Sequence, residues 1–394
     1  MRVAERRDGC FDGVAMPGLA FSSDSRHVAF PVQEAGRWRV VRDGRAGIAW
    51  DGVSSLTFSP DGEHLAYAAL GGNSWRLVLD ERAGESWDRL LPGTIIFAPR
   101  GAHLAYAGSR DGRVHAVRDG VAGPAYDDIE TLRFSHDGVR FSYVARRGGQ
   151  AMVVIDGVEG ESHESISEIA FSGSGRRVAH VARDSATWYV VEGETVLGPY
   201  GSARSLGYLP GRDTLVCVVG AADGEAILVG RSIGPRYGSV GAPSYSKNAE
   251  RWGYIARRGD SSAVVIDGAV ARVEQSARDL VFSPDGLRYA YIALRKGDSF
   301  VVDEDNAHPF ALLIDGSLTF TGDSRAWACL AGDPAKRRLF VVVEGLRRRG
   351  AFDWTEMARI TRGRMSVATG GVDSEFARAW VAAEAERMRG ETLR

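Results

Sequence analysis

The residues best suited to do chemistry in this chain are basic side chains that recur at a fixed distance behind a series of aromatic residues. The pairs Arg146-Arg147 and Arg257-Arg258 each lie 12 and 13 residues after an aromatic residue. Guanidinium groups bind carboxylates and phosphates through two parallel hydrogen bonds, so the chemistry offered is recognition of an acidic ligand. The full basic set comprises Arg110, Arg146, Arg147, Arg183, Arg257, Arg258, Arg295 and Lys296.

No catalytic or metal-binding motif accompanies these basic residues. The eight histidines form no HxH or HExxH spacing, and the three cysteines are widely separated. The sequence has no GxSxG nucleophile elbow, no Walker A loop and no dinucleotide fingerprint. His27, His64 and His103 share a repeat position that other repeats fill with arginine, which favours a solvated turn residue. We therefore predict a non-catalytic protein with no cofactor and no bound metal.

The elements that position the basic residues come from an internal repeat. Nine aromatic anchors are separated by intervals of 37 to 39 residues, which is typical of a repeat protein. In the second repeat, a short apolar strand enters Phe58, Ser59-Pro60-Asp61-Gly62 turns the chain, and a strand beginning Leu65-Ala66-Tyr67 follows. The anchors are Phe21, Phe58, Phe97, Phe134, Phe171, Tyr208, Tyr245, Phe282 and Phe320.

Each repeat continues with two further strands. A third strand often ends in Asp-Gly, as at Asp156-Gly157, which is a strong hairpin signal. A weaker fourth strand carries an aromatic–acid pair in several repeats, such as Trp87-Asp88. Four short antiparallel strands with no helical period between them define one blade of a β-propeller. The aspartates that recur in the turn, such as Asp61, are expected to have a structural role.

These repeats resemble the WD40-like repeats of TolB-type and prolyl-oligopeptidase-type β-propellers. The resemblance covers about residues 10–345 and implies the fold of a bacterial propeller protein, with no particular activity. The turns of the fifth to seventh repeats depart from the pattern. The segments that carry it are Phe58-Ser59-Pro60-Asp61-Gly62, Phe134-Ser135-His136-Asp137-Gly138 and Phe282-Ser283-Pro284-Asp285-Gly286.

Propeller geometry would gather the basic residues on one rim. The loops between the second and third strands emerge on the same face as the loops between the fourth and first strands. The basic set would then form an arc that binds an acidic partner protein or a phosphate-bearing ligand. The alternative is that carboxylates in the companion loops neutralise the arc in weak surface pairs. These carboxylates are Asp51, Asp88, Asp127, Asp128 and Glu130.

The predicted fold is all-β, a single propeller of four-stranded blades in residues 1–350. The repeat count gives nine blades, with eight as the alternative. The segment Phe11-Asp12-Gly13-Val14 resembles Trp50-Asp51-Gly52-Val53, which the pattern assigns to a fourth strand. We therefore expect the N-terminal strand to join the last blade and close the ring, which would remove a free edge.

The repeat stops near residue 350. Residues 351–372 are predicted to be a basic connector, and residues 335–364 carry nine basic and three acidic side chains. Residues 373–394 are expected to form a short amphipathic helix and tail, with Phe376, Trp380 and Ala383 on one face. This face either packs on the propeller or docks a partner protein.

Composition narrows the function further. The formal net charge of −2 over 394 residues excludes binding of nucleic acid through bulk charge. No apolar run has the length of a signal peptide or a membrane span, which predicts a cytoplasmic protein. We predict a protein–protein interaction scaffold. The alternatives are an enzyme or a small-molecule or carbohydrate-binding protein that uses the central channel, and nucleic-acid contact through the basic C-terminal segment.

Overall fold

The computed structural model divides the chain into two compact units, residues 1–196 and 197–394, with the boundary inside a strand. Each unit is described by itself. The structure describes residues 13–14, 18–100, 103–248, 250–304, 306–333, 338–344, 351–353, 365–366, 371–372, 378 and 381–385.

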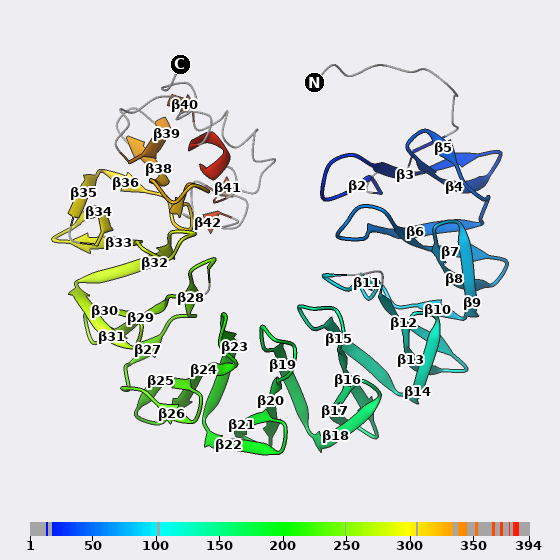
Figure 1. Ribbon diagram of the computed structural model, residues 1–394, viewed down its shortest axis with the longest axis horizontal. Helices are drawn as coiled ribbons and strands as arrows, with labels where there is room; N and C mark the ends of the chain where they lie inside the picture. Colours follow the sequence, from blue (N-terminus) through cyan, green and yellow to red (C-terminus); the bar gives the residue numbers. More distant parts are fainter. Residues whose placement is uncertain are drawn as a thin grey trace. The chain divides into compact units, whose positions relative to one another are not determined.

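The first unit consists of successive antiparallel sheets, each four strands deep and here called a blade (Figure 1). In blades 1 and 3 the first strand is split into two short pieces that both pair with the second strand. Blade 1 contains β1 (Gly13–Val14), β2 (Ala20–Phe21), β3 (Val28–Glu34), β4 (Arg37–Arg42) and β5 (Arg45–Ala46). Blade 2 contains β6 (Gly52–Phe58), β7 (Leu65–Gly71), β8 (Ser74–Leu79) and β9 (Arg82–Trp87). Blade 3 contains β10 (Arg89–Leu90), β11 (Ile96–Phe97), β12 (Leu104–Arg110), β13 (Arg113–Arg118) and β14 (Val121–Tyr126). Blade 4 contains β15 (Asp128–Phe134), β16 (Phe141–Arg147), β17 (Gln150–Ile155) and β18 (Val158–His163). Blade 5 contains β19 (Ser165–Phe171), β20 (Val178–Asp184), β21 (Thr187–Glu192) and β22 (Thr195–Tyr200).

The second unit repeats the same blade. Blade 6 contains β23 (Ser202–Leu209), β24 (Thr214–Ala221), β25 (Gly224–Val229) and β26 (Ser232–Ile233). Blade 7 contains β27 (Ser239–Val240), β28 (Ser244–Tyr245), β29 (Trp252–Arg258), β30 (Ser261–Ile266) and β31 (Ala269–Glu274). Blade 8 contains β32 (Ser276–Phe282), β33 (Tyr289–Arg295), β34 (Asp298–Asp303) and β35 (Asn306–Phe310). Blade 9 contains β36 (Leu312–Leu313), β37 (Thr319–Phe320), β38 (Trp327–Asp333), β39 (Arg338–Val343) and β40 (Ala351–Asp353). A small pair, β41 (Met365–Ser366) and β42 (Gly371–Val372), and the helical residues 378 and 381–385 complete the described residues.

The nine aromatic anchors correspond to nine blades among the described residues, so the predicted all-β fold of four-stranded blades is confirmed. The ninth blade extends slightly further than expected, because β40 at Ala351–Asp353 pairs with β39 inside the predicted basic connector. Apart from β40, β41 and β42, residues 351–372 lie outside the described residues.

The N-terminal strand pairs within the first blade. Gly13 and Val14 pair with Gln33 and Val32 of β3, so β1 is part of blade 1. The expected assignment of Gly52-Val53 to a fourth strand was wrong, because those residues begin the first strand of blade 2. Gly13 and Val14 therefore belong to the sheet of blade 1, and closure of the ring by the N-terminal strand stays a prediction.

The turns that pair a serine or threonine with an aspartate after the anchor are held by these side chains, as predicted. In blade 2 the Ser59 hydroxyl donates to Asp61 Oδ1 at 2.5 Å, and the same oxygen accepts the Glu63 amide at 3.0 Å. These hydrogen bonds lower the pKa of Asp61. Gly62 has φ +80°, and a Cβ there would lie 3.1 Å from Ser22 Cβ in the preceding blade. Successive turns therefore stack. Glycine is suited to this position because it adopts a positive φ without strain and has no side chain to collide with the preceding turn.

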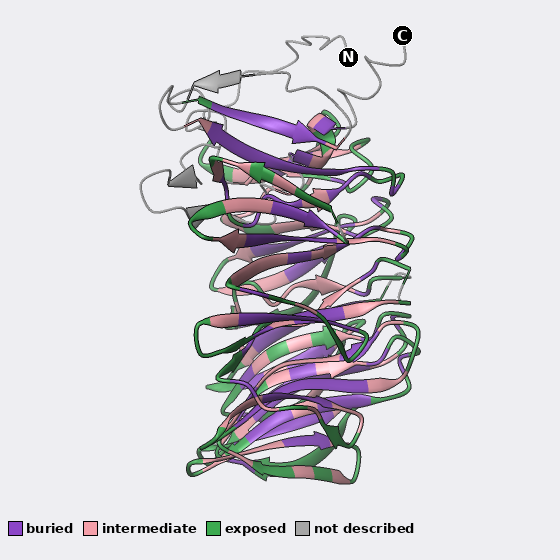
Figure 2. Ribbon diagram, turned by 90° about the vertical axis from the view of Figure 1, so that its left-hand side faces the viewer, coloured by how far each residue is buried: buried purple, intermediate pink, exposed green. Residues whose placement is uncertain are grey.

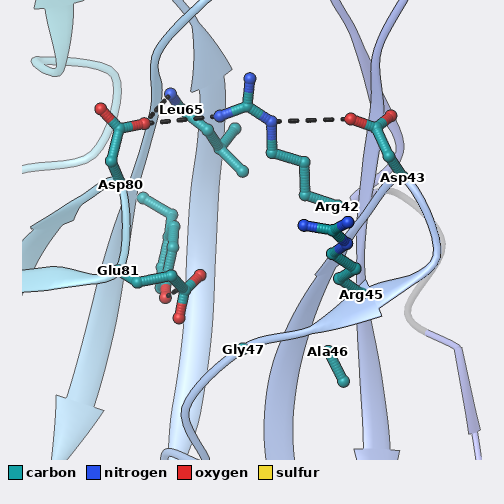
Figure 3. Close-up of a pocket in the computed structure, with 9 residues that line it drawn as sticks. Arg42, Asp43, Arg45, Ala46, Gly47, Leu65, Asp80 and Glu81 are labelled. Atoms are coloured by element: carbon teal, nitrogen blue, oxygen red, sulfur yellow. Dashed lines mark hydrogen bonds and ion pairs between the residues drawn. The ribbon is translucent and has the colours of Figure 1, made fainter.

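The repeated histidines are more constrained than solvated turn residues. His64 Nδ1 lies 2.6 Å from Asp80 Oδ2, and Asp80 Oδ1 accepts the Leu65 amide at 3.0 Å. Figure 3 shows Asp80 on the Leu65 amide, with Arg42 of blade 1 reaching both Asp80 and Asp43. Asp80, which is followed by Glu81, thus ties the end of the third strand to the start of the second strand, as the aspartates of four Asp-Gly hairpins do in other blades. The matching pairs are His27–Asp43, His103–Asp119, Arg140–Asp156 and Arg251–Asp267.

Within each unit, consecutive blades pack face to face, and buried residues concentrate along the strands (Figure 2). On β7, Leu65 and Tyr67 pack with Ala29 and Val40 of blade 1. Ala66 points to the other face and packs with residues of blade 3, including Tyr106. The alternation of large and small residues therefore gives each blade room for the tyrosine of the next.

A recurring contact joins consecutive blades within each unit. The residue that ends a fourth strand packs against the third residue of the following blade's second strand, and we call these two residues a joint pair. Trp87 Nε1 donates to Tyr106 OH at 3.2 Å, and the rings of Tyr126 and Tyr143 are 6.0 Å apart. In the second unit, Tyr291 OH donates to Glu274 Oε1 at 2.9 Å. Hydroxyl and aromatic groups thus satisfy one another inside most joints.

The joint between blades 4 and 5 is built from two histidines. His163 ends β18 and His180 is the third residue of β20, with ring centroids 6.0 Å apart. Burial and, as a smaller effect, the neighbouring His163 together lower the pKa of His180 to about 4. His180 is therefore neutral at pH 7.

Turn stacking predicts different costs for two glycine substitutions in the same unit. Gly138 has φ +78°, and a Cβ there would lie 2.3 Å from the Arg100 carbonyl oxygen. Gly120 has φ +80° but no atom within 4 Å of an added Cβ. Gly120→Ala is expected to cost about 1–2 kcal/mol from backbone strain alone, and Gly138→Ala about 1–3 kcal/mol more from overpacking. Urea unfolding measures both, and equal losses would contradict the stacking of the turns.

The histidine joint predicts a loss of stability in mild acid. His180 has a lowered pKa in the folded state, so the unfolded chain binds its proton more readily. This contribution to stability is intact above pH 6.5, and it falls by up to about 3 kcal/mol as pH drops toward 4. The difference in unfolding free energy between pH 7 and pH 4.5 should be smaller in His180→Tyr, which has the tyrosine of neighbouring joints. The same difference in both proteins would refute a buried neutral His180.

Candidate anion-binding site

Most of the predicted rim arginines are engaged in contacts between blades. The Arg110 guanidinium lies 4.3 Å from the ring centre of Trp87 in the preceding blade, and its Nη2 is 3.1 Å from Glu85. Arg147 lies 4.9 Å from the Tyr126 ring and makes two hydrogen bonds to Glu159, at 2.8 and 3.0 Å. Each of these side chains covers a joint pair from the solvent side and has a carboxylate partner.

Arg295 repeats this arrangement in the second unit. Its Nε and Nη2 donate to the two Glu274 oxygens at 2.8 and 2.5 Å, and the Glu274 side chain is only 4% exposed. Of the remaining members, Arg146 also has a carboxylate partner, at 2.6 Å, and the others except Arg257 make contacts of other kinds. Arg146 pairs with Glu130, Arg183 donates to the Ser185 carbonyl, Arg258 lies over the Tyr237 ring, and the exposed Lys296 donates its amide to Gln275.

The companion carboxylates have a second use that the sequence did not indicate. Asp51, Asp88 and Asp127 accept the amides of Gly72, Asp111 and Gly148 at 2.7 to 2.8 Å. Each therefore holds the hairpin of the next blade. Asp51 and Asp127 also pair with Arg37 and Arg113, and Glu130 pairs with Arg146. Asp128 is exposed and accepts the amide of the next residue. The described residues therefore do not form a continuous arc of unpaired positive charge.

Arg257 differs from the rest of the basic set. It is exposed, and its side chain has no hydrogen bond or ion pair within the part of the chain that the structure describes. It lines a groove of about 710 Å³ with three further arginines. These are Arg204 on β23, Arg278 on β32 and Arg378 in the C-terminal helical segment. We call this feature the arginine groove, and all of it lies in the second unit.

Backbone bulges place two of these arginines. Arg204 and Arg278 lie four residues before their anchors, and the strand register shifts directly after each of them. The next residues, Ser205 and Asp279, have φ of 56° and 55°, in the left-handed region. A bulge bends the strand and redirects the adjacent side chains, so equivalent positions of two blades present arginine to one groove.

The groove has an excess of positive charge. Arg204 donates to Glu225 at 2.8 Å, and Arg278 donates to Asp315 at 2.7 Å. Arg378 Nε is buried and lacks a hydrogen-bond partner among the described residues. Asp279 also lines the groove, but burial raises its pKa despite a hydrogen bond from the Gly316 amide. Two guanidinium groups are therefore available for a carboxylate or phosphate.

The C-terminal helix packs through a face other than the predicted one. Val381 and Ala385 are fully buried and contact the core of blade 9, including Leu330 and Val341. Ala383 is exposed, while Phe376 and Trp380 lie outside the described residues. Packing of this segment on the last blade explains how Arg378 reaches the groove.

Sequence reasoning missed Arg204, Arg278 and Arg378. A signal for the first two was present, because aligning the repeats on their anchors places both arginines at the same position. Nothing local marks Arg378. Within the described ranges, no group of three or more histidine, cysteine, aspartate or glutamate residues is arranged to hold a metal ion. No helix in the same ranges is long and apolar enough to cross a membrane.

Comparisons with known proteins address the fold. No family model and no curated protein matches the chain. The β-propeller domain of the Trilobed protease from Pyrococcus furiosus is 12% identical, with a TM-score of 0.32, over 65% of this chain and 96% of that one. TolB from Acinetobacter baumannii is 14% identical, with a TM-score of 0.27, over 72% of this chain and 65% of that one. The assignment of blades rests on the strand pairing of this chain.

The buried carboxylate of a joint should be needed for stability. Glu274→Ala leaves Tyr291 and Arg295 without their partner, and we expect it to lower the unfolding free energy by about 2–3 kcal/mol. Glu63→Ala is the control, because Glu63 is exposed and should change stability by less than about 0.5 kcal/mol. Denaturant unfolding of the three proteins measures this. A loss at Glu274 as small as that at Glu63 would show that the joint does not depend on its charge pair.

Proposed function

We propose that this protein is a non-catalytic interaction scaffold that binds an acidic segment of a partner protein in the arginine groove. The observation that carries the proposal is the convergence of four arginines from three blades and the C-terminal segment on one surface hollow. Most other basic residues of the predicted rim are used in contacts within and between blades, so the groove is where cationic groups remain available.

The size of the groove favours a peptide segment over a single ion. A volume of about 710 Å³ lies in the range of pockets that enclose drug-sized molecules, of about 300–1,000 Å³. The exposed Arg257 and the half-buried Arg378 provide two separate contact points. Spaced guanidinium groups match a run of carboxylates on an extended or turned chain.

The hydrogen bonds of the polar groups that line the groove favour ligand binding over catalysis. The Ser244 hydroxyl donates to the Leu280 carbonyl at 2.9 Å, so it faces its own strand neighbours. Asp279 is held by the Gly316 amide. A nucleophile hydrogen-bonded to a general base is the arrangement that would favour the enzyme alternative.

Charge reversal at the available arginines tests the proposal. A fluorescent peptide rich in glutamate is expected to bind the full chain, and Arg257→Glu combined with Arg378→Gln should weaken binding at least tenfold, measured by anisotropy. Binding should also weaken as salt is added, because exposed charges are screened. Arg204 and Arg278 are left intact because both already hold a carboxylate of the fold.

The matched control is Arg89→Glu, an exposed residue of blade 3 outside the groove, which should bind the peptide as the unmodified chain does. Equal binding by all three proteins would contradict the proposal. Preference for a phosphorylated peptide of equal charge would indicate a phosphate ligand in the same groove. Affinity capture from the native cell with the same variants would then identify the partner.

A further inference from the structure

The joint between blades 4 and 5 departs from its neighbours, and we infer that His163 and His180 form a binding site for a divalent transition-metal ion such as Zn²⁺. At two other joints, Trp87 and Glu274 each share a hydrogen bond with the hydroxyl of a tyrosine. Here both positions are histidine, and no hydroxyl is present to satisfy the ring nitrogens. This inference is independent of the arginine groove.

His163 has the surroundings of a metal ligand. The residue is 7% exposed, and its Nδ1 lies 2.8 Å from Asp184 Oδ2. A carboxylate at Nδ1 holds the proton there and leaves the lone pair on Nε2. That Nε2 atom is buried and has no hydrogen-bond partner among the described residues. A buried imidazole nitrogen without a partner is costly, and a bound cation would satisfy it.

His180 supplies the second nitrogen. Its Nε2 is also buried and without a partner in the described part of the chain. The two rings therefore offer two unsatisfied nitrogens at one joint.

The spacing of the rings fits a shared ion. Zn–N bonds of about 2.0–2.1 Å place the centres of two rings on one ion at most roughly 6.5 Å apart. The observed separation of 6.0 Å is within this limit, with an angle of 59° between the ring planes. A small movement of either ring would reach the tetrahedral angle.

The joint opens to a pocket that can supply further ligands. A pocket of about 570 Å³ is lined by both histidines and by the exposed Glu161 and Glu194. Arg140 also lines it but is paired with Asp156 at 2.8 Å. Two imidazoles completed by water favour Zn²⁺, Ni²⁺ or Co²⁺ over Ca²⁺ and Mg²⁺, which prefer oxygen ligands.

Calorimetric titration of the chelator-treated full chain with zinc chloride at pH 7.5 tests the site. We expect one ion per chain, a rise in thermal midpoint that EDTA reverses, and no response to magnesium. His163→Tyr combined with His180→Tyr reproduces the Tyr126–Tyr143 joint, so it should fold and lose at least tenfold in affinity. Asp184→Asn, which alters only the residue that positions His163, should lose about tenfold.

His64→Asn is the control, because His64 is a surface histidine paired with a carboxylate, and it should bind zinc as the unmodified chain does. Imidazole ¹⁵N NMR of the unmodified chain gives a readout that needs no substitution, since zinc should shift the signals of two histidines. Absence of zinc binding at millimolar concentration, equal binding by the double tyrosine variant, or shifts confined to other histidines would each overturn the inference.

Discussion

The contact between the end of one blade's fourth strand and the second strand of the next blade is the interaction on which the rest of this structure depends. A four-stranded sheet with two apolar faces is unstable when both faces are exposed to water, so neighbouring blades must cover them. The joint pairs fix how blades meet, because a bulky side chain such as Trp87 or Tyr126 fits where the facing blade presents small residues. Turn stacking at the opposite strand ends fixes the same spacing, as at Gly62 and Gly138.

This packing also determines where charge is used. Arg110, Arg147 and Arg295 lie over the joints, where a guanidinium group covers an aromatic ring or holds a buried carboxylate. Their charge is therefore part of the fold. Charge remains available at Arg257, which has no carboxylate partner in the described part of the chain, and at Arg378, whose buried Nε has no hydrogen-bond partner there although Asp279 is near. The arginine groove arises because bulges, strand ends and the C-terminal segment meet there.

The functional candidates coincide with departures from the repeat. Bulge positions that hold arginine in blades 6 and 8 form the groove, and the joint that holds two histidines forms the proposed metal site. In a repeat protein, equivalent positions of most repeats hold residues that pack in the same way. A repeat that has a different residue type at such a position is therefore a candidate for a function of its own. The unsatisfied nitrogens of His163 and His180 are an example, because Trp87, at the position of His163 in an earlier blade, is satisfied by a tyrosine hydroxyl.

Features set by residues close in sequence could be predicted from the sequence alone. The period, the nine blades, the Asp-Gly hairpins and the structural role of Asp61 all depend on turns and strand alternation within one repeat. Tertiary structure alone decided that β1 pairs inside blade 1, that Val381 and not Ala383 faces the core, and that Arg378 joins Arg204 in a groove. These outcomes depend on which distant segments pack together, and burial and charge pairing at such contacts are not encoded in local spacing. His163 and His180 belong partly to each group. Alignment of the repeats shows that both histidines occupy joint positions, but only the packing shows that their Nε2 atoms have no partner among the described residues.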